Sequence, residues 1–194
     1  MESNERPTTQ EIEFLTLSFN RFYDIFEEVM SDDFMQKNDF YRFSRIKDAF
    51  AVYAELLYYD PIKKYIELLK ETRPPSETEI GNDLFNFIRN VITHYPFFDR
   101  WDDIWISNSL ANWYKEGQSI DRFLEKYKGH QTIKYRFWEA SKKRMTFVII
   151  NFPGTYNKGT RVFLNYYLTE NEGIKFSLLL MKQIIDSQVE QIKK

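Results

Sequence analysis

The stretch TTQEIEFLTLSFNRFYDIFEEVM, residues 8–30, sets the architecture that we expect for the whole chain. Its large apolar residues recur at spacings of three and four, which places them on one face of an α-helix. They are Leu15, Phe19, Phe22, Phe26 and Val29. Thr8 and Glu11 have the spacing of a capping box, in which the threonine side chain accepts from the third amide and the glutamate reaches back. The stretch therefore predicts a helix from about Thr9 to Met30.

Helical spacing returns along most of the remaining chain. Ser76 and Glu79 have the spacing of a second capping box, and Pro96 should close the helix that they open, because a residue that precedes proline disfavours helical angles. Asp102 or Asp103 is expected near the start of another helix. The ranges expected to be helical are 39–59, 61–71 behind an Asp60 cap, 76–95, 100–115, 119–128 with a stop at Gly129, and 171–193.

The segment from Lys134 to Leu168 has a different composition. MTFVIINFP (145–153) and TRVFLNYYL (160–168) are rich in β-branched and aromatic residues, and the turn-forming GTYNKG lies between them. We expect a small β-hairpin here. The predicted fold is mainly α: one helical domain over 1–194, a bundle with a β-hairpin embellishment in its C-terminal third that occupies about 134–168.

The composition is that of a folded protein with nearly balanced charge. Among the 194 residues are 18 Phe, 13 Tyr and 4 Trp, which is ample material for a hydrophobic core. The 27 Lys and Arg against 29 Asp and Glu give a net charge of −2, whereas a protein that binds long nucleic acids through many phosphates is usually strongly basic. An RNA partner would therefore have to meet a local basic patch.

Several classes of site and location are disfavoured. The chain has no cysteine and two histidines, which excludes disulfides and does not supply the ligands of a zinc site, so we expect no metal and no cofactor. The N-terminal residues are polar, and the longest apolar runs are too short to cross a bilayer. We expect no membrane partner and a cytoplasmic location.

A basic cluster lies at Lys142, Lys143 and Arg144, beside Trp138 and Tyr135. Cations interleaved with aromatic rings can hold single-stranded nucleic acid through phosphate contacts and base stacking. A solvent-exposed turn commonly has the same composition. The cluster is therefore either an RNA-binding site or an exposed turn without a binding role.

Arg89, Asn90 and His94 are the candidate catalytic residues. On a helix that ends before Pro96, His94 lies in the last turn, where the helix dipole favours its protonated form. Asn90 and His94 lie one above the other, with Arg89 offset by about 100°. Such a group suits phosphoryl transfer, since the histidine can move a proton and the arginine can stabilise charge on phosphate. The alternative is a capping histidine and an arginine paired with a nearby acid.

The stretch RNVITH, residues 89–94, resembles the signature of the HEPN superfamily. That signature is an arginine, commonly followed by a polar residue, with a histidine a few positions beyond, on a helix of a helical bundle. The resemblance implies a metal-independent endoribonuclease, of the kind common in toxin–antitoxin and antiphage systems, whose motifs meet in a homodimer. By the same resemblance His94 serves as acid or base, Arg89 holds the scissile phosphate, and Asn90 orients the histidine or a phosphate oxygen.

Other members of that superfamily have lost catalysis. The resemblance therefore also allows a non-catalytic module that binds a partner protein, such as an antitoxin or another regulator, or a nucleotide. A third possibility is a purely structural helical protein in which His94 is only a cap. An RNA substrate and a homodimer are expected only if the chain is a ribonuclease. The resemblance does not indicate which RNA would be cleaved.

Overall fold

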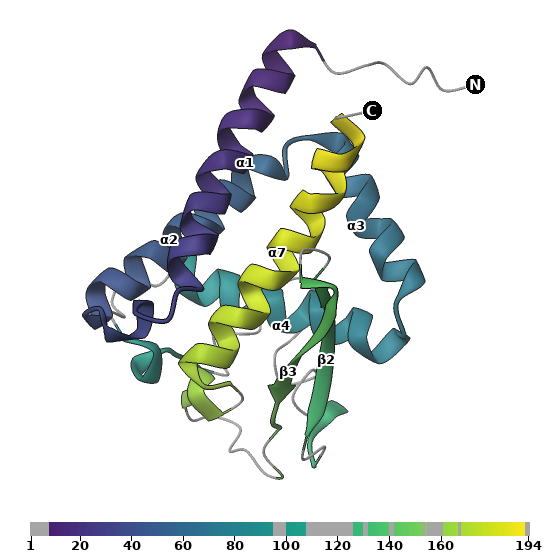
Figure 1. Ribbon diagram of the computed structural model, residues 1–194. Coiled ribbons are helices and arrows are strands. Elements are labelled where there is room, and N and C mark those ends of the chain that lie inside the picture. Colours follow the sequence, from purple (N-terminus) through teal and green to yellow (C-terminus); the bar gives the residue numbers. More distant parts are fainter. Residues whose placement is uncertain are drawn as a thin grey trace.

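The computed structural model describes residues 8–94, 100–107, 126–129, 132–139, 142–152, 154, 161–166 and 168–192. Within these residues the protein is mainly helical, with a small antiparallel hairpin in the C-terminal third, as predicted (Figure 1). The long helices are α1 (Thr9–Val29), α2 (Asp39–Leu56), α3 (Asp60–Thr72), α4 (Pro75–His94) and α7 (Glu170–Ile192). The strands are β1 (Trp105–Ser107), β2 (Ile133–Glu139), β3 (Arg144–Ile150) and β4 (Arg161–Phe163). Short 3-10 turns are η1 (Phe34–Gln36), η2 (Trp101–Asp103) and η4 (Leu164–Tyr166).

The first helix begins and packs as its sequence predicts. The Glu11 amide donates to Thr8 Oγ1 at 3.2 Å, and the Thr8 amide donates to Glu11 Oε2 at 2.7 Å, so both halves of the capping box are present. The backbone hydrogen bond from Thr8 lowers the pKa of the Glu11 carboxyl. Of the predicted apolar stripe, all residues are buried except Phe26, which is half-buried against the core.

The starts of two other helices differ from the prediction. Tyr59, not Asp60, is the cap of α3, and Asp60 lies in the first turn, where its carboxylate pairs with Lys63 at 3.0 Å. The start of α4 is one residue before Ser76, because Pro75 takes the first helical position and the Pro74 carbonyl accepts from the Thr78 amide at 3.0 Å. A proline in the first turn lacks only an amide hydrogen that the helix would leave unpaired. The expected capping box of Ser76 and Glu79 is therefore wrong.

The predicted helix at 100–115 is wrong over its described part. Arg100–Ser107 contains the 3-10 turn η2 and the strand β1, which pairs with β4 so that Trp105 faces Phe163. The remainder of that range, and residues 119–125 of the next predicted helix, lie outside the described residues. The predicted stop at Gly129 is confirmed, since this glycine has φ +79° after a short helical turn.

The hairpin contains one of the two predicted strands, β3, but its partner is β2 and not the segment at 160–168. Strand β3 pairs with β2 through the turn that carries Lys142 and Lys143, so that Tyr135 faces Val148. Residues 161–163, expected to pair with β3, pair instead with β1. Strand β2 alternates buried and exposed residues, which is the pattern of a strand with one buried face.

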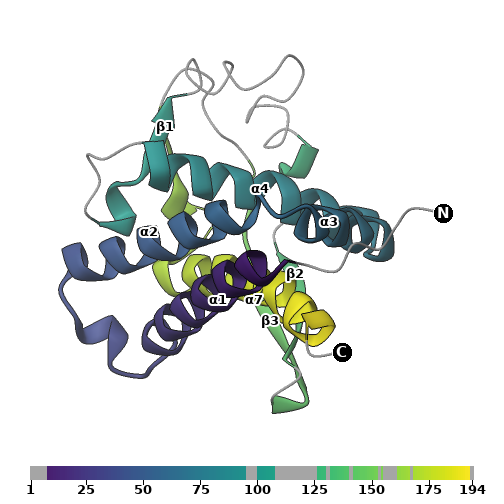
Figure 2. The same ribbon diagram turned by 90° about the horizontal axis from the view of Figure 1, so that it is seen from above.

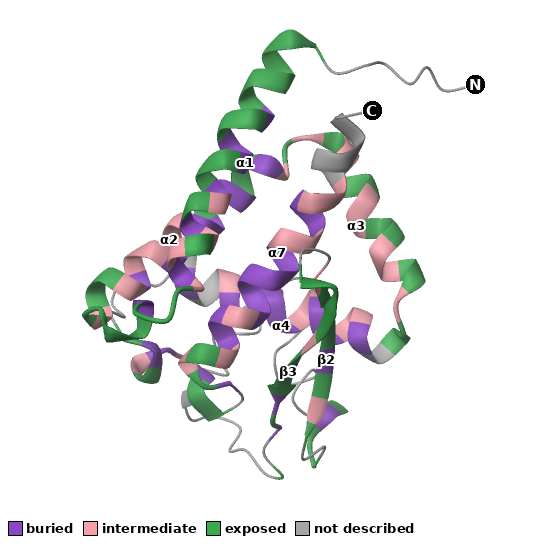
Figure 3. Ribbon diagram, viewed as in Figure 1, coloured by how far each residue is buried: buried purple, intermediate pink, exposed green. Residues whose placement is uncertain are grey.

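Helix α7 is the centre of the fold. It contacts α1, α2, α3 and α4 as well as both strands of the hairpin, and it runs through the middle of the molecule in two perpendicular views (Figures 1 and 2). Six consecutive residues, 176–181, are buried, so this part of the helix has no exposed face (Figure 3). A helix that is apolar all round is one that is surrounded by other elements.

The first turn of α7 is tied to a buried tryptophan. Trp101 is buried, its indole N–H donates to the Leu168 carbonyl at 2.9 Å, and its ring lies against Gly173. A Cβ at Gly173 would come within 2.2 Å of the Trp101 ring, so only glycine permits this contact. None of the described helices has a stretch long and apolar enough for a membrane span.

Candidate functional site

A polar row of side chains runs along α4. Thr78, Asn82 and Asn86 are spaced by four residues and therefore lie one above the other on one side of the helix. Asn90 and His94 occupy the next two positions of the same row by spacing. Their side chains lie outside the described part of the structure, whereas their backbone belongs to the last described turns of α4 (Pro75–His94). We call this set, together with the adjacent Arg89, the α4 row.

Thr78, Asn82 and Asn86 border a pocket of about 140 Å³ that is lined by residues of α2, α3, α4, α7 and β2. Its walls are mainly apolar and aromatic, and include Tyr53, Phe85 and Tyr135. Polar side chains at the pocket are Lys70, Arg73, Thr78, Asn82, Asn86 and Arg89. Pockets with apolar walls and a few convergent polar groups are the usual form of a ligand site. Arg89 is thus the one predicted catalytic residue whose described side chain lines a pocket.

The Arg89 side chain is half-buried and lies near the phenol of Tyr53. Burial raises the pKa of Tyr53, while the positive charge of Arg89 acts in the opposite direction. Tyr53 also packs edge-on against Phe85, with ring centroids 5.4 Å apart. The wall of the pocket therefore brings a permanent cation beside aromatic rings, an arrangement suited to a ligand with an anionic part and a flat part.

Asn82 and Asn86 form hydrogen bonds with neighbouring side chains of α4. Asn82 Nδ2 donates to Asp83 Oδ1 at 2.9 Å, and Asn86 Nδ2 donates to Asn82 Oδ1 at a long 3.5 Å. Burial raises the pKa of the Asp83 carboxyl, and the hydrogen bond from Asn82 opposes that shift. The amide of Asn86 can exchange its long bond for a shorter one to a bound molecule.

Arg73, at the far wall of the pocket, has a structural role. Its guanidinium donates to Gln183 Oε1 at 2.5 Å, to the Arg136 carbonyl at 3.0 Å and to Glu77 Oε2 at 3.2 Å, and it lies 4.8 Å from the centroid of Tyr135. Glu77, which is buried, also accepts from Arg136 Nε at 2.6 Å. These contacts attach the hairpin to the corner between α3 and α4.

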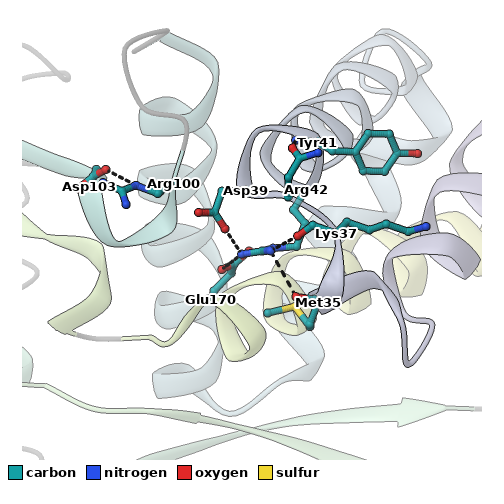
Figure 4. Close-up of polar contacts among 9 residues, drawn as sticks. Met35, Lys37, Asp39, Tyr41, Arg42, Arg100, Asp103 and Glu170 are labelled. Atoms are coloured by element: carbon teal, nitrogen blue, oxygen red, sulfur yellow. Dashed lines mark hydrogen bonds and ion pairs between the residues drawn. The ribbon is translucent and has the colours of Figure 1, made fainter.

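A second arginine cluster, at the start of α7, is saturated by protein groups. Arg42 on α2 donates through Nε to Glu170 Oε1 at 2.8 Å, and its other nitrogens bond to Asp39, to Glu170 and to the Met35 and Lys37 carbonyls (Figure 4). The bonds join α2, η1 and the first turn of α7. We call Arg42, Glu170, Trp101 and Gly173 the α7 clamp.

The predicted RNA-binding cluster lies in the turn of the hairpin. Lys142 Nζ pairs with Glu139 Oε2 at 2.8 Å, and Arg144 Nε lies 3.7 Å from Glu139 Oε1. Burial raises the pKa of Glu139, but hydrogen bonds from Lys142 and Thr146 and the nearby cations outweigh it and lower that pKa. Lys143 has φ 49° and is exposed. Of the two expected ring neighbours, Trp138 points outward and Tyr135 is buried on the opposite face.

Sequence reasoning found Arg89 but missed the residues around it. The four-residue spacing of Thr78, Asn82 and Asn86 was a visible signal of a polar row. Tyr53 and Tyr135 reach the pocket only through tertiary packing, which no local pattern indicates. Among the described residues, no group of three or more His, Cys, Asp or Glu side chains could hold a metal ion.

Comparison with known proteins gives no relative from which a function could be transferred. No family model, no curated protein and no solved structure matches the chain.

Proposed function

We propose that this chain is a metal-independent endoribonuclease of the HEPN type, which works as a cytoplasmic homodimer in a toxin–antitoxin or antiphage system. The observation that carries the proposal is the position of RNVITH at the end of α4, with the Arg89 side chain at the wall of a pocket. An arginine at a pocket wall can bind a phosphate, and the asparagine and histidine of the same motif follow within five residues on the same helix, which supports phosphate chemistry.

The proposed reaction needs no metal. His94 accepts the proton of a ribose 2′-hydroxyl, and the 2′-oxygen attacks the adjacent phosphorus. The bond from phosphorus to the 5′-oxygen breaks, and a protonated His94, of the same or the partner subunit, gives its proton to that leaving oxygen. Arg89 binds the phosphate and stabilises its additional negative charge. Asn90 orients the histidine or a phosphate oxygen. The products are a 2′,3′-cyclic phosphate and a 5′-hydroxyl.

A symmetric dimer reconciles this reaction with the net charge of −2. Two copies of Arg89 and His94 around one cleft concentrate positive potential where the phosphate binds, and a two-fold axis presents the same surface from both subunits. The offset between Arg89 and His94 on one helix is also accommodated when both chains contribute residues to each site.

The test is cleavage of mixed single-stranded RNA in EDTA, with the fragment ends identified by chemistry. The unmutated chain should produce cyclic phosphates, and His94→Ala should not, while Asn20→Ala on the exposed side of α1 should cleave normally. Fragments with 3′-hydroxyl ends, or cleavage that persists in His94→Ala, would assign the activity to another nuclease and contradict the proposal.

A second candidate function is a non-catalytic module that binds a nucleotide. The half-buried Arg89 beside Tyr53 and Phe85 favours it, because a phosphate and a base could use the cation and the rings without any reaction. Titration calorimetry with nucleoside monophosphates separates the two: binding that is lost in Arg89→Gln, together with no cleavage of any RNA, would favour this module over the nuclease.

A further inference from the structure

The outer face of the hairpin carries large apolar side chains in register. On β3, Met145, Phe147 and Ile149 are 44%, 50% and 43% exposed, and on β2 Trp138 is 55% exposed. Trp138 faces Met145 across the ladder, and Arg136 faces Phe147. The inner face contrasts with this, since Tyr135, Phe137, Val148 and Ile150 are at most 1% exposed. The hairpin therefore fills the core with one face and leaves four large apolar side chains exposed on the other.

The hairpin is also the basic part of an acidic protein. Residues 133–150 contain five Lys and Arg side chains and one carboxylate, whereas the rest of the chain has 22 cations and 28 carboxylates. Lys134, Arg136 and Trp138 follow one another on the outer side of β2, at every second position. Among the described residues Lys134 and Lys143 form no ion pair, so both charges are available to a partner. The charge complements an anionic partner.

We propose that the outer face of the β2–β3 hairpin, with Trp138 and Phe147 as its rings, binds single-stranded RNA by base stacking. Diagonal neighbours on an antiparallel ladder stand about 7 Å apart, which puts Trp138 and Phe147 within reach of adjacent bases of one strand. Lys134 and Lys143 contact the phosphates on either side. Exposed aromatic residues on a sheet, flanked by cations, hold single strands in this way with little dependence on sequence.

The composition favours RNA over a second copy of the chain. The centre of an interface between identical subunits is depleted of charge, whereas this face carries Lys134 and Arg136 beside its rings. This inference depends on the proposed function in one respect, namely that the substrate is RNA. It assigns binding to residues that take no part in the reaction.

The test measures binding apart from cleavage. A labelled oligonucleotide of about 12 nucleotides with 2′-O-methyl groups cannot form the cyclic phosphate, so the full unmutated chain can be titrated by anisotropy. Trp138→Ala and Phe147→Ala should each weaken binding about tenfold, and Trp138→Phe should restore most of it, because phenylalanine also stacks. Phe40→Ala, which removes a ring 71% exposed on α2, is the matched control and should leave binding unchanged.

The charge contribution is tested with salt. In a plot of the logarithm of the affinity against the logarithm of the salt concentration, Lys134→Gln and Lys143→Asn should each reduce the slope by about one unit. Asparagine is chosen at position 143 because it tolerates the left-handed backbone there. Two results would overturn the inference: equal affinity in Trp138→Ala, Phe147→Ala and Phe40→Ala, or a dimer that dissociates in Trp138→Ala while oligonucleotide affinity is unchanged. Trp138-dependent binding without cleavage would instead refute only the nuclease.

Discussion

The α7 clamp and the α4 row place similar side chains in opposite roles. In the clamp, Arg42 donates to two carboxylates and two carbonyls, and the Trp101 indole donates to Leu168, so the polar groups hold helices together. Along α4, Asn82, Asn86 and Arg89 border a pocket. The difference teaches that the surroundings of an arginine set its role: Arg42 holds three elements together, whereas Arg89 lies at the wall of a pocket.

The comparison predicts two classes of variants. Changes in the clamp should lower stability and leave the chemistry of a folded molecule unaltered. Changes along the α4 row should lower activity and leave stability nearly unaltered. The following predictions test this separation.

Among the variants that separate the α4 row from the α7 clamp, Arg89→Lys should have the largest effect on activity. Lysine keeps the charge but loses the planar group that can hold two phosphate oxygens, so the cleavage rate should fall by about 10²-fold. Single-turnover kinetics on RNA measure the rate, and thermal melting should give a value close to that of the unmutated chain. If the rate fell only in proportion to the loss of folded protein, Arg89 would have a structural role and no part in the reaction.

Gly173→Ala should destabilise the fold by about 3 kcal/mol, because the new methyl group overlaps the buried Trp101 ring and neither element can shift freely. Urea unfolding followed by tryptophan fluorescence measures this. Gly154→Ala is the matched control, since a Cβ at Gly154 meets nothing within 4 Å. Equal stability of the two variants would show that Trp101 does not pack on α7 as described.

Arg42→Ala should lower the free energy of unfolding by about 2 kcal/mol, because it leaves the partly buried carboxylate of Glu170 without its partner. Arg21→Ala, on the exposed side of α1, should change it by less than about 0.5 kcal/mol. The difference between the two free energies of unfolding is the measurement. No difference would mean that the clamp contributes nothing to stability.

The smallest effect is expected for Ser177→Ala. Ser177 is 1% exposed in the middle of α7, and its hydroxyl has no hydrogen-bond partner among the described residues. Removing an unsatisfied buried hydroxyl should leave the stability unchanged or raise it by up to about 1 kcal/mol. A loss of stability, measured by urea unfolding, would point to a hydrogen bond that the serine makes.

Local signals predicted most of the long helices and the strand β3, but not the pairing of the strands. The capping box of Thr8 and Glu11 and the apolar stripe of α1 are properties of adjacent turns, so the sequence alone revealed them. The pairing of β1 with β4 joins Trp105 to Phe163 across a long stretch of chain, and no neighbouring residue indicates it. The strand at 145–153 was predicted, but its partner β2 was not, because the turn at Lys142 and Lys143 was weighed as a binding patch or a solvated turn and not as the turn of the hairpin.

The candidate site shows the same division. The spacing of Arg89, Asn90 and His94 was visible in the sequence, as was the helix end before Pro96. The pocket was not, because Tyr53, Tyr135 and Leu180 come from three different elements that only the packing around α7 brings together.

The central claim is that the end of α4 is an active site and not a polar seam of the bundle. The most direct measurement is the RNA cleavage rate of His94→Ala in EDTA, taken together with its melting temperature. The account predicts a rate lower by at least about 10²-fold at an unchanged melting temperature. A variant that melts lower but, where folded, cleaves as fast as the unmutated chain would contradict the account and make His94 a helix cap.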